Sequence, residues 1–285
     1  MATLKNTTIN DTGAIQLPVG TTAQRPASPS TGDMRYNTDN DSFEYYNGNE
    51  WKSSLTVVRN GLVLYLDAGN PSSYSGTGTA WYDLSGNDFH MSLKNSPNFN
   101  ATDKTFELNG SNQYGSCDGT VSGSTPATVS NLGVGGNSPK TVVCVAQVRE
   151  IGSTDGGMFD LGDSGSIGRH YCLRFRGSYT NWRAQFWQTP DYDFSYDGSA
   201  SFTSYSVVYG ADKIGRTYGN NATLLGQDDG PFDLNTAGSR PFEMGRYSGS
   251  LYGGFKIHAY LVYNRALSEA EIQQNFNAFQ NRTGF

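Results

Sequence analysis

Side chains capable of acid–base or nucleophilic chemistry are few in this chain, and their spacing is unfavourable. Glycoside hydrolysis needs two carboxylates about 5 to 9 Å apart across a cleft, but the chain has no E-x-D-x-x-E motif and no E-x-E pair on a predicted strand. The histidines His90, His170 and His258 are widely separated, and no G-x-S-x-G turn accompanies them. We therefore predict that the protein is not an enzyme.

Three aspartates in a glycine-rich acidic stretch, Asp155, Asp160 and Asp163, are candidates for a calcium site. Carboxylate oxygens are the ligands that calcium prefers. However, a D-x-D-x-D-G loop is absent, and scattered loop aspartates usually form turns. Calcium binding and turn formation are therefore the two alternatives for these residues, and no other cofactor is expected.

One stretch of the chain concentrates side chains suited to sugar binding. Such surfaces combine flat aromatic faces with amide and carboxylate hydrogen bonds, and Trp182, Trp187, Tyr192 and Tyr196 stand among aspartates here. Strand alternation prevents Trp182, Arg183 and Trp187 from all sharing one surface. The alternative to a glycan site is therefore that these tryptophans pack between sheets.

The end of the chain predicts a strand followed by a short helix. Residues 255–263 alternate with the period-2 pattern of a strand with one buried face. The buried side would carry Phe255, Ile257, Ala259, Leu261 and Tyr263, and the polar side Lys256, His258, Tyr260 and Val262. Ser268 and Glu271 have the spacing of a capping box, so a helix should begin at Glu269. Its apolar stripe, which must dock on something, comprises Ile272, Phe276 and Phe279.

The composition favours strands and turns over helices. The 285 residues include 35 Gly, 18 Tyr and 15 Phe, which predicts an all-β protein. A net charge of −6 without a basic cluster argues against nucleic-acid binding. The three cysteines, Cys117, Cys144 and Cys172, lack metal-ligand spacing and should be buried free thiols. No apolar run approaches the roughly 20 residues of a membrane span, and no secretory signal is evident, so we expect a soluble protein made in a cytoplasm.

The N-terminal part divides into an arm and a small β-segment. Residues 1–32 are polar and proline-containing, and they predict an extended anchoring arm or linker. Residues 33–58 predict a small β-meander with an Asn-Gly turn, which is too small to be stable alone. Its exposed apolar residues are Met34, Tyr36, Phe43, Tyr45 and Trp51. The same segment from a second and a third copy of the chain would cover these residues, so we predict a homotrimer.

The run LPVGTTAQRPASPSTGDMRYNTDNDSFEYYNGNEW, residues 17–51, resembles a segment that recurs in tail fibres, head fibres and other virion proteins of tailed bacteriophages. In that family it generally serves as a shaft or anchoring connector, often a trimeric one. The resemblance implies a position on the virion surface, synthesis in the host cytoplasm, and attachment to capsid or tail proteins through the arm.

Residues 59–285 form the main domain in this interpretation. GLVLYLDAGNPSSYSGTGTAWYDLSGN and FELNGSNQYGS resemble the opening of a laminin-G-like, concanavalin A-type jelly roll, and YGGFKIHAYLVYNRALSEAEI is similar to that family's ending. The expected fold is an antiparallel β-sandwich with one short C-terminal helix.

Two functions follow from these resemblances. The first is a non-enzymatic structural protein of the virion, either a head fibre, a capsid decoration or a tail-associated fibre, with the jelly roll displayed outward for weak adhesion. The alternative is a receptor-binding module that recognises host surface glycans. No membrane insertion is expected in either case.

Overall fold

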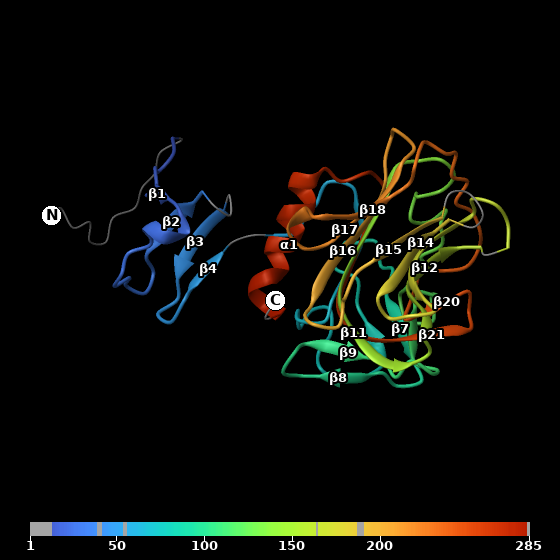
Figure 1. Cartoon of the computed structure of the whole chain (residues 1–285). Helices are drawn as coiled ribbons and strands as arrows, with labels where there is room; N and C mark the ends of the chain where they lie inside the picture. The colour runs from blue at the N-terminus through green and yellow to red at the C-terminus, as the bar shows by residue number, and fades with distance from the viewer. Residues whose placement is uncertain (1–12, 39–41, 54–55, 164, 187–190, 284–285) are drawn as a thin grey trace. The chain divides into compact units, whose positions relative to one another are not determined.

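The computed structural model describes residues 13–38, 42–53, 56–163, 165–186 and 191–283. The chain consists of two compact units, residues 1–56 and residues 57–285 (Figure 1). Among the described residues, no helix is long and apolar enough to cross a membrane.

The N-terminal unit is built on a small four-stranded sheet with strand order β1-β2-β3-β4. Strand β1 runs parallel to β2, and the remaining neighbours are antiparallel. Its elements are β1 (Val19–Gly20), the 3-10 turn η1 (Thr22–Gln24), β2 (Met34–Asn37), β3 (Ser42–Tyr46) and β4 (Trp51–Ser53). Gly48, in the loop after β3, has a φ of 99°, the left-handed conformation that favours glycine.

One face of this sheet buries charged and amide groups where an apolar core would be expected. Arg35, Asn37 and Glu44 are all buried. The Glu44 carboxylate accepts hydrogen bonds from Arg25 at 2.7 and 3.2 Å and from Asn37 at 3.1 Å, and Arg35 lies 3.4 Å away. Burial raises the pKa of Glu44, but these partners outweigh it and hold that pKa below its ordinary value. Buried charge pairs therefore hold the segment around η1 against the sheet.

The second unit is a sandwich of two antiparallel sheets, which confirms the predicted fold class. The back sheet has the order β18-β17-β16-β11-β21-β5, and β9 and β8 extend it beside β21. Its strands are β5 (Leu62–Asp67), β8 (Asn98–Asn100), β9 (Thr105–Glu107), β11 (Lys140–Gly152), β16 (Thr203–Tyr209), β17 (Gly215–Tyr218), β18 (Leu224–Gln227) and β21 (Leu251–Tyr263). A 3-10 turn, η2 (Asn220–Ala222), joins β17 to β18.

The front sheet has the order β6-β7-β10-β19-β12-β13-β14-β15. Its strands are β6 (Ala80–Trp81), β7 (Met91–Lys94), β10 (Tyr114–Ser116), β12 (Asp155–Gly162), β13 (His170–Arg176), β14 (Asn181–Gln185), β15 (Tyr192–Ser195) and β19 (Glu243–Met244). The two-residue strand β20 (Arg246–Tyr247) pairs with the start of β21. The two sheets are not closed into a barrel.

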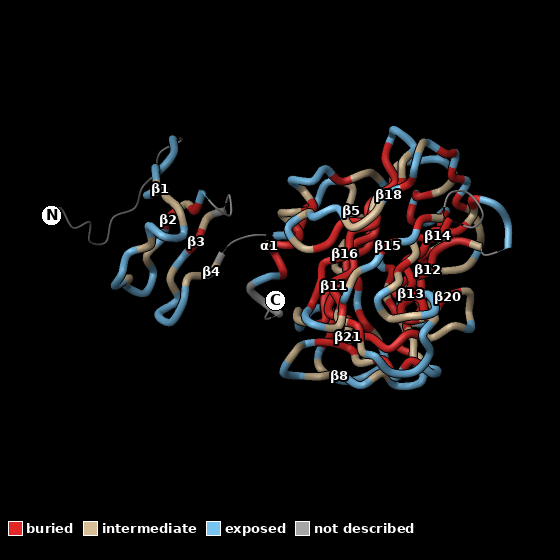
Figure 2. The backbone as a smooth tube through the Cα atoms, in the orientation of Figure 1, coloured by how far each residue is buried: buried red, intermediate tan, exposed pale blue. Residues whose placement is uncertain are grey.

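Buried residues fill the space between the two sheets (Figure 2), and many of them are aromatic. Trp81 packs on Phe106 with ring centroids 4.7 Å apart, and Trp182 packs on Tyr205 at 5.1 Å. The hydroxyl of Tyr260, on the back sheet, donates to the carbonyl of Met158 on the front sheet at 2.5 Å. Cys117, Cys144 and Cys172 are buried free thiols, as predicted.

A β-bulge in β21 changes which residues face the core, so the predicted alternation is only partly correct. Val145 of β11 pairs with Ala259 and Ala146 pairs with Ile257, which leaves His258 as the extra residue. Before the bulge, Phe255 and Ile257 point into the core; after it, Tyr260 and Val262 do. Ala259, Leu261 and Tyr263 point to the opposite side of the back sheet and are nevertheless fully buried.

Helix α1 (Glu269–Thr283) covers that opposite side. The capping box is confirmed, because the Ser268 N–H donates to the Glu271 carboxylate at 2.9 Å and the Glu271 N–H donates to Oγ of Ser268 at 3.4 Å. The Tyr263 hydroxyl lies 3.3 Å from Oδ1 of Asn275 on the helix, and the Val58 N–H donates to the same oxygen at 2.9 Å. The predicted stripe of Ile272, Phe276 and Phe279 is buried.

Candidate functional site

The outer face of the front sheet carries a row of polar side chains that crosses five strands. The register pairs Ser116 with Glu243, Glu243 with Asp160, Asp160 with Cys172, and Cys172 with Gln185. Residues paired across neighbouring strands share a face of the sheet. These five residues, which we call the polar row, therefore lie side by side although they are distant in sequence.

The polar row points away from the sandwich core. Next to it along the strands stand residues that belong to the core, namely Met244, Phe159, Leu173 and Ala184. Because successive side chains alternate between the faces of a strand, the row must lie on the other face. All members of the row are nonetheless buried, so other parts of the chain cover it.

The middle of the row, at Glu243 and Asp160, is contacted by the segment from Gly245 to Ser250, which contains β20 and which we call the flap. Arg246 of the flap forms a two-pronged ion pair with Glu243, at 2.8 and 2.5 Å. Its guanidinium lies over the ring of Tyr114, 3.6 Å from the ring centroid. The ring centroids of Tyr114 and Tyr252 are 6.1 Å apart. Burial acts to lower the pKa of Arg246, but the Glu243 carboxylate outweighs it and raises that pKa.

Tyr247 of the flap lies against two side chains of β13, next to the polar row. Its ring centroid is 5.2 Å from that of His170 and 4.3 Å from the guanidinium carbon of Arg174. Arg174 in turn donates to Asp155 at 2.8 Å. Burial raises the pKa of the Tyr247 hydroxyl, so the ring is neutral at physiological pH.

One partly exposed area of this face includes Arg246 of the flap. Tyr114, Arg246 and Tyr252 are each partly exposed, and they bring two aromatic rings and one cation together. Sugars bind to such surfaces by stacking on rings and by hydrogen bonding to charged groups. We call these three residues the tyrosine–arginine rim.

Of the residues predicted to bind glycan, the three that the structure describes pack into or against the core. Trp182 is fully buried, stacks on Phe194 at 6.4 Å, and donates its indole N–H to the carbonyl of Tyr196 at 3.0 Å. Tyr192 is buried, with its hydroxyl 2.7 Å from that of Thr217, and Tyr196 is half-buried against the core. Trp187 lies outside the described residues. The alternative that the Trp182 ring packs between the sheets is correct, because Trp182 alternates with Arg183, which faces outward.

The three aspartates proposed as calcium ligands also do not come together. Asp155 pairs with Arg174 at 2.8 Å, and Asp163 pairs with Arg169 at 3.1 Å. Asp160 is fully buried in contact with His170. Asp155 and Asp163 are each held by an arginine and Asp160 lies beside His170, so the structure does not group the three carboxylates around one point, as a shared calcium site would need.

The predicted oligomerisation residues of the N-terminal unit occupy two faces. Register pairs place Met34 beside Tyr45, and Tyr36 beside Phe43, on the face opposite to Glu44. Met34 and Tyr45 are 53% and 41% exposed. Trp51 lies on the other face, since it pairs with Tyr46, which is two residues from Glu44. Trp51 therefore does not share a surface with the other four, and the role of these five residues in oligomerisation stays a prediction.

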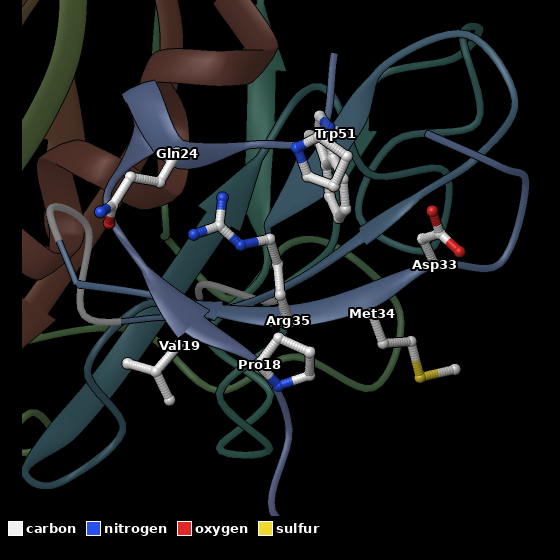
Figure 3. Close-up of a pocket in the computed structure, with 8 residues that line it drawn as sticks. Pro18, Val19, Gln24, Asp33, Met34, Arg35 and Trp51 are labelled. Carbon is white, nitrogen blue, oxygen red and sulfur yellow. The ribbon is translucent and has the colours of Figure 1, made fainter. Parts of the chain in front are cut away.

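Trp51 instead lines a cavity of about 480 Å³ in the N-terminal unit. Figure 3 shows the Arg35 side chain directed into the space between Gln24 and Trp51, whereas Val19 and Met34 point to the other side of the sheet. Arg35 also donates to the carbonyl of Thr21 at 3.0 Å. Val19 and Met34 also line this cavity, so it borders the exposed apolar face of the unit.

Comparison with known proteins identifies the fold of the second unit. No family model and no curated protein sequence matches the chain. A Trypanosoma rangeli sialidase in complex with sialic acid matches with a TM-score of 0.53 and 16% identity, covering 78% of this chain and 33% of the sialidase. A binding domain of botulinum neurotoxin DC in complex with SialylT matches with a TM-score of 0.56 and 13% identity, covering 78% of this chain and 52% of that domain. The chain thus spans a third to a half of the length of these proteins.

The sialidase matches contradict the prediction that the protein is not an enzyme, because enzymes share this fold over 78% of the chain. The structure also removes part of the reasoning behind that prediction. Glu243 and Asp160 are direct register partners on β19 and β12, and such partners have Cβ atoms about 4.5 to 5.5 Å apart. A search for two acids along one strand cannot find a pair that two strands contribute.

Proposed function

We propose that the sandwich is a glycan-recognition domain whose contact surface is the tyrosine–arginine rim. The observation that carries this proposal is the arrangement of Tyr114, Arg246 and Tyr252, with Arg246 fixed by Glu243 at 2.8 and 2.5 Å. An arginine held in place loses little conformational entropy when it binds a ligand. The two tyrosine rings beside it provide faces for stacking.

Sialylated glycans are the first ligands to test. One similar sialidase structure holds sialic acid and one similar toxin domain holds SialylT. A carboxylated sugar also suits the rim, since a carboxylate can pair with the outer edge of the Arg246 guanidinium. The ligand class therefore rests on the neighbours' ligands together with the chemistry of the rim.

The N-terminal unit would carry this domain on a virion. Support comes from the resemblance of residues 17–51 to the connector segments of tailed-phage fibres. The exposed face with Val19, Met34 and Tyr45 would be covered by two further copies of the chain, giving a homotrimer. A position on the head would indicate a decoration protein, and a position on the tail would indicate a receptor-binding fibre. Electron microscopy of immunolabelled particles distinguishes the two positions.

A glycan array tests recognition with full-length protein. The wild type should bind sialylated members, and Tyr114→Ala and Tyr252→Ala should each reduce that binding roughly 5- to 150-fold, if stacking on one ring contributes the ~1 to 3 kcal/mol known for a base on an aromatic side chain. Leu224→Ala is the matched control, as Leu224 is 47% exposed on β18 of the back sheet. Equal binding by all four proteins would refute the rim, and absence of any bound glycan would refute the function.

A further inference from the structure

We propose that Asp160, His170 and Cys172 form a binding site for a divalent transition metal, of which zinc fits best. One ligand atom from each residue, a carboxylate oxygen, an imidazole nitrogen and the thiol sulfur, lies within 4.8 Å of the others. All three side chains are fully buried. This inference does not depend on the proposed glycan function.

The sheet positions these three groups without help from a flexible loop. His170 and Cys172 are two residues apart on β13, so both project from the same face. Asp160 on β12 is the direct register partner of Cys172. Ligands on neighbouring hydrogen-bonded strands are held close to their final geometry before the metal arrives.

The donor set distinguishes zinc from calcium. Zinc is bound by cysteine sulfur, histidine nitrogen and aspartate oxygen, with bond lengths of roughly 2.0 to 2.3 Å. Calcium takes 6 to 8 oxygen ligands, and this cluster offers one carboxylate. Among the described residues, no fourth His, Cys, Asp or Glu joins the group. The fourth position would therefore be open to water or a ligand atom, as in catalytic zinc sites.

The surroundings of Asp160 fit the role of a metal ligand. Its Oδ2 atom accepts the Ser248 N–H at 2.7 Å and lies 3.7 Å from Arg240, whereas Oδ1 faces His170. Partners on one carboxylate oxygen orient the other toward the metal. An entering ion would replace the direct contact between Asp160 and His170, and the Cys172 thiol would release its proton to solvent as the metal–sulfur bond forms.

Cobalt binding tests the site, because a thiolate bound to cobalt gives a charge-transfer absorption that oxygen and nitrogen ligands do not. Full-length protein, stripped with a chelator, is titrated with Co²⁺ and then with Zn²⁺. The wild type should show this band at one cobalt per chain, and zinc should abolish it. Cys172→Ser should lose the band, and Cys117→Ser, which alters another buried free thiol, should keep it.

Two results would overturn the proposal. One is a wild type without a thiolate band at stoichiometric cobalt, and the other is a band of equal intensity in Cys172→Ser. Should that variant fail to fold, X-ray absorption at the zinc edge of the wild type decides the question. One sulfur among the zinc ligands supports the site, and a shell of oxygen and nitrogen alone refutes it.

Discussion

Replacing Asp228 with asparagine should change how the stability of the sandwich depends on pH. Asp228 is 2% exposed, and its Oδ2 accepts the Gly215 N–H at 2.8 Å. Burial raises the pKa of this carboxyl to about 7, and the negative charges of Asp191 and Asp229 act in the same direction. The Gly215 hydrogen bond and Arg216 oppose the shift without cancelling it.

The sign and size follow from linkage. Because the folded-state pKa of Asp228 is raised, the folded protein keeps a proton that the unfolded chain loses above its ordinary pKa of 3.8. The contribution of protonated Asp228 to the stability of the folded protein is complete below pH 3.8 and is lost as the pH rises to about 7. At 1.36 kcal/mol for each pKa unit, the loss amounts to roughly 4 kcal/mol. The asparagine in Asp228→Asn does not ionise, so this variant should not lose that stability as the pH rises.

Urea unfolding followed by tryptophan fluorescence at pH values between 4 and 8 measures this difference. Asp228→Asn should match the wild type near pH 4 and exceed it increasingly toward pH 7. Asp212→Asn is the control, since the Arg216 hydrogen bond lowers the pKa of the exposed Asp212 and its removal should not stabilise the protein as pH rises. A constant difference between wild type and Asp228→Asn across this range would refute the reasoning.

Three further predictions concern stability, all measured by chemical denaturation. Lys140 is buried, donates to Gly136 at 3.0 Å, and has its pKa lowered by burial to about 7; the wild type should therefore gain stability relative to Lys140→Met as pH rises from 7 to about 10. Ser268→Ala should cost ~1 kcal/mol through loss of the helix cap, and unchanged stability would argue against the cap's contribution. Gly157→Ala would place a Cβ 2.5 Å from the carbonyl oxygen of Arg246, so the flap must shift and the free energy of unfolding should fall by ~1 to 3 kcal/mol. Gly165→Ala is the control, because its added Cβ has no atom within 4 Å and only backbone strain should lower its stability.

Local patterns in the sequence predicted the elements of the chain's end, because those elements depend on near neighbours. The capping box of Ser268 and Glu271 and the start of α1 are set within four residues. The bulge at His258 could not be predicted in the same way. It is defined by the register between β21 and β11, a pairing of strands more than a hundred residues apart, and without it the alternation in 255–263 assigns half of the strand to the wrong face.

The candidate sites depend on register to a greater degree. Glu243, Asp160 and Cys172 become neighbours only through the pairing of β19, β12 and β13, and nothing in their spacing along the chain indicates it. Trp182 shows the converse error, because the residue type suited to sugar stacking is also the type that fills a core best. Composition alone could not decide between those roles, but its alternation with Arg183 could.

The polar row explains why the two proposed sites of the sandwich can be tested separately. Glu243 is held by Arg246, and Asp160 by His170 and Ser248, so each carboxylate already has a partner of its own. Removing one partner of a buried charge pair typically costs ~3 to 5 kcal/mol, so a variant of Arg246 would confuse lost binding with lost folding. Tyr114 and Tyr252 contribute partly exposed rings, and Cys172 contributes a neutral thiol in the absence of metal. Substitutions at these three positions leave the buried charges paired, and each reports on one site only.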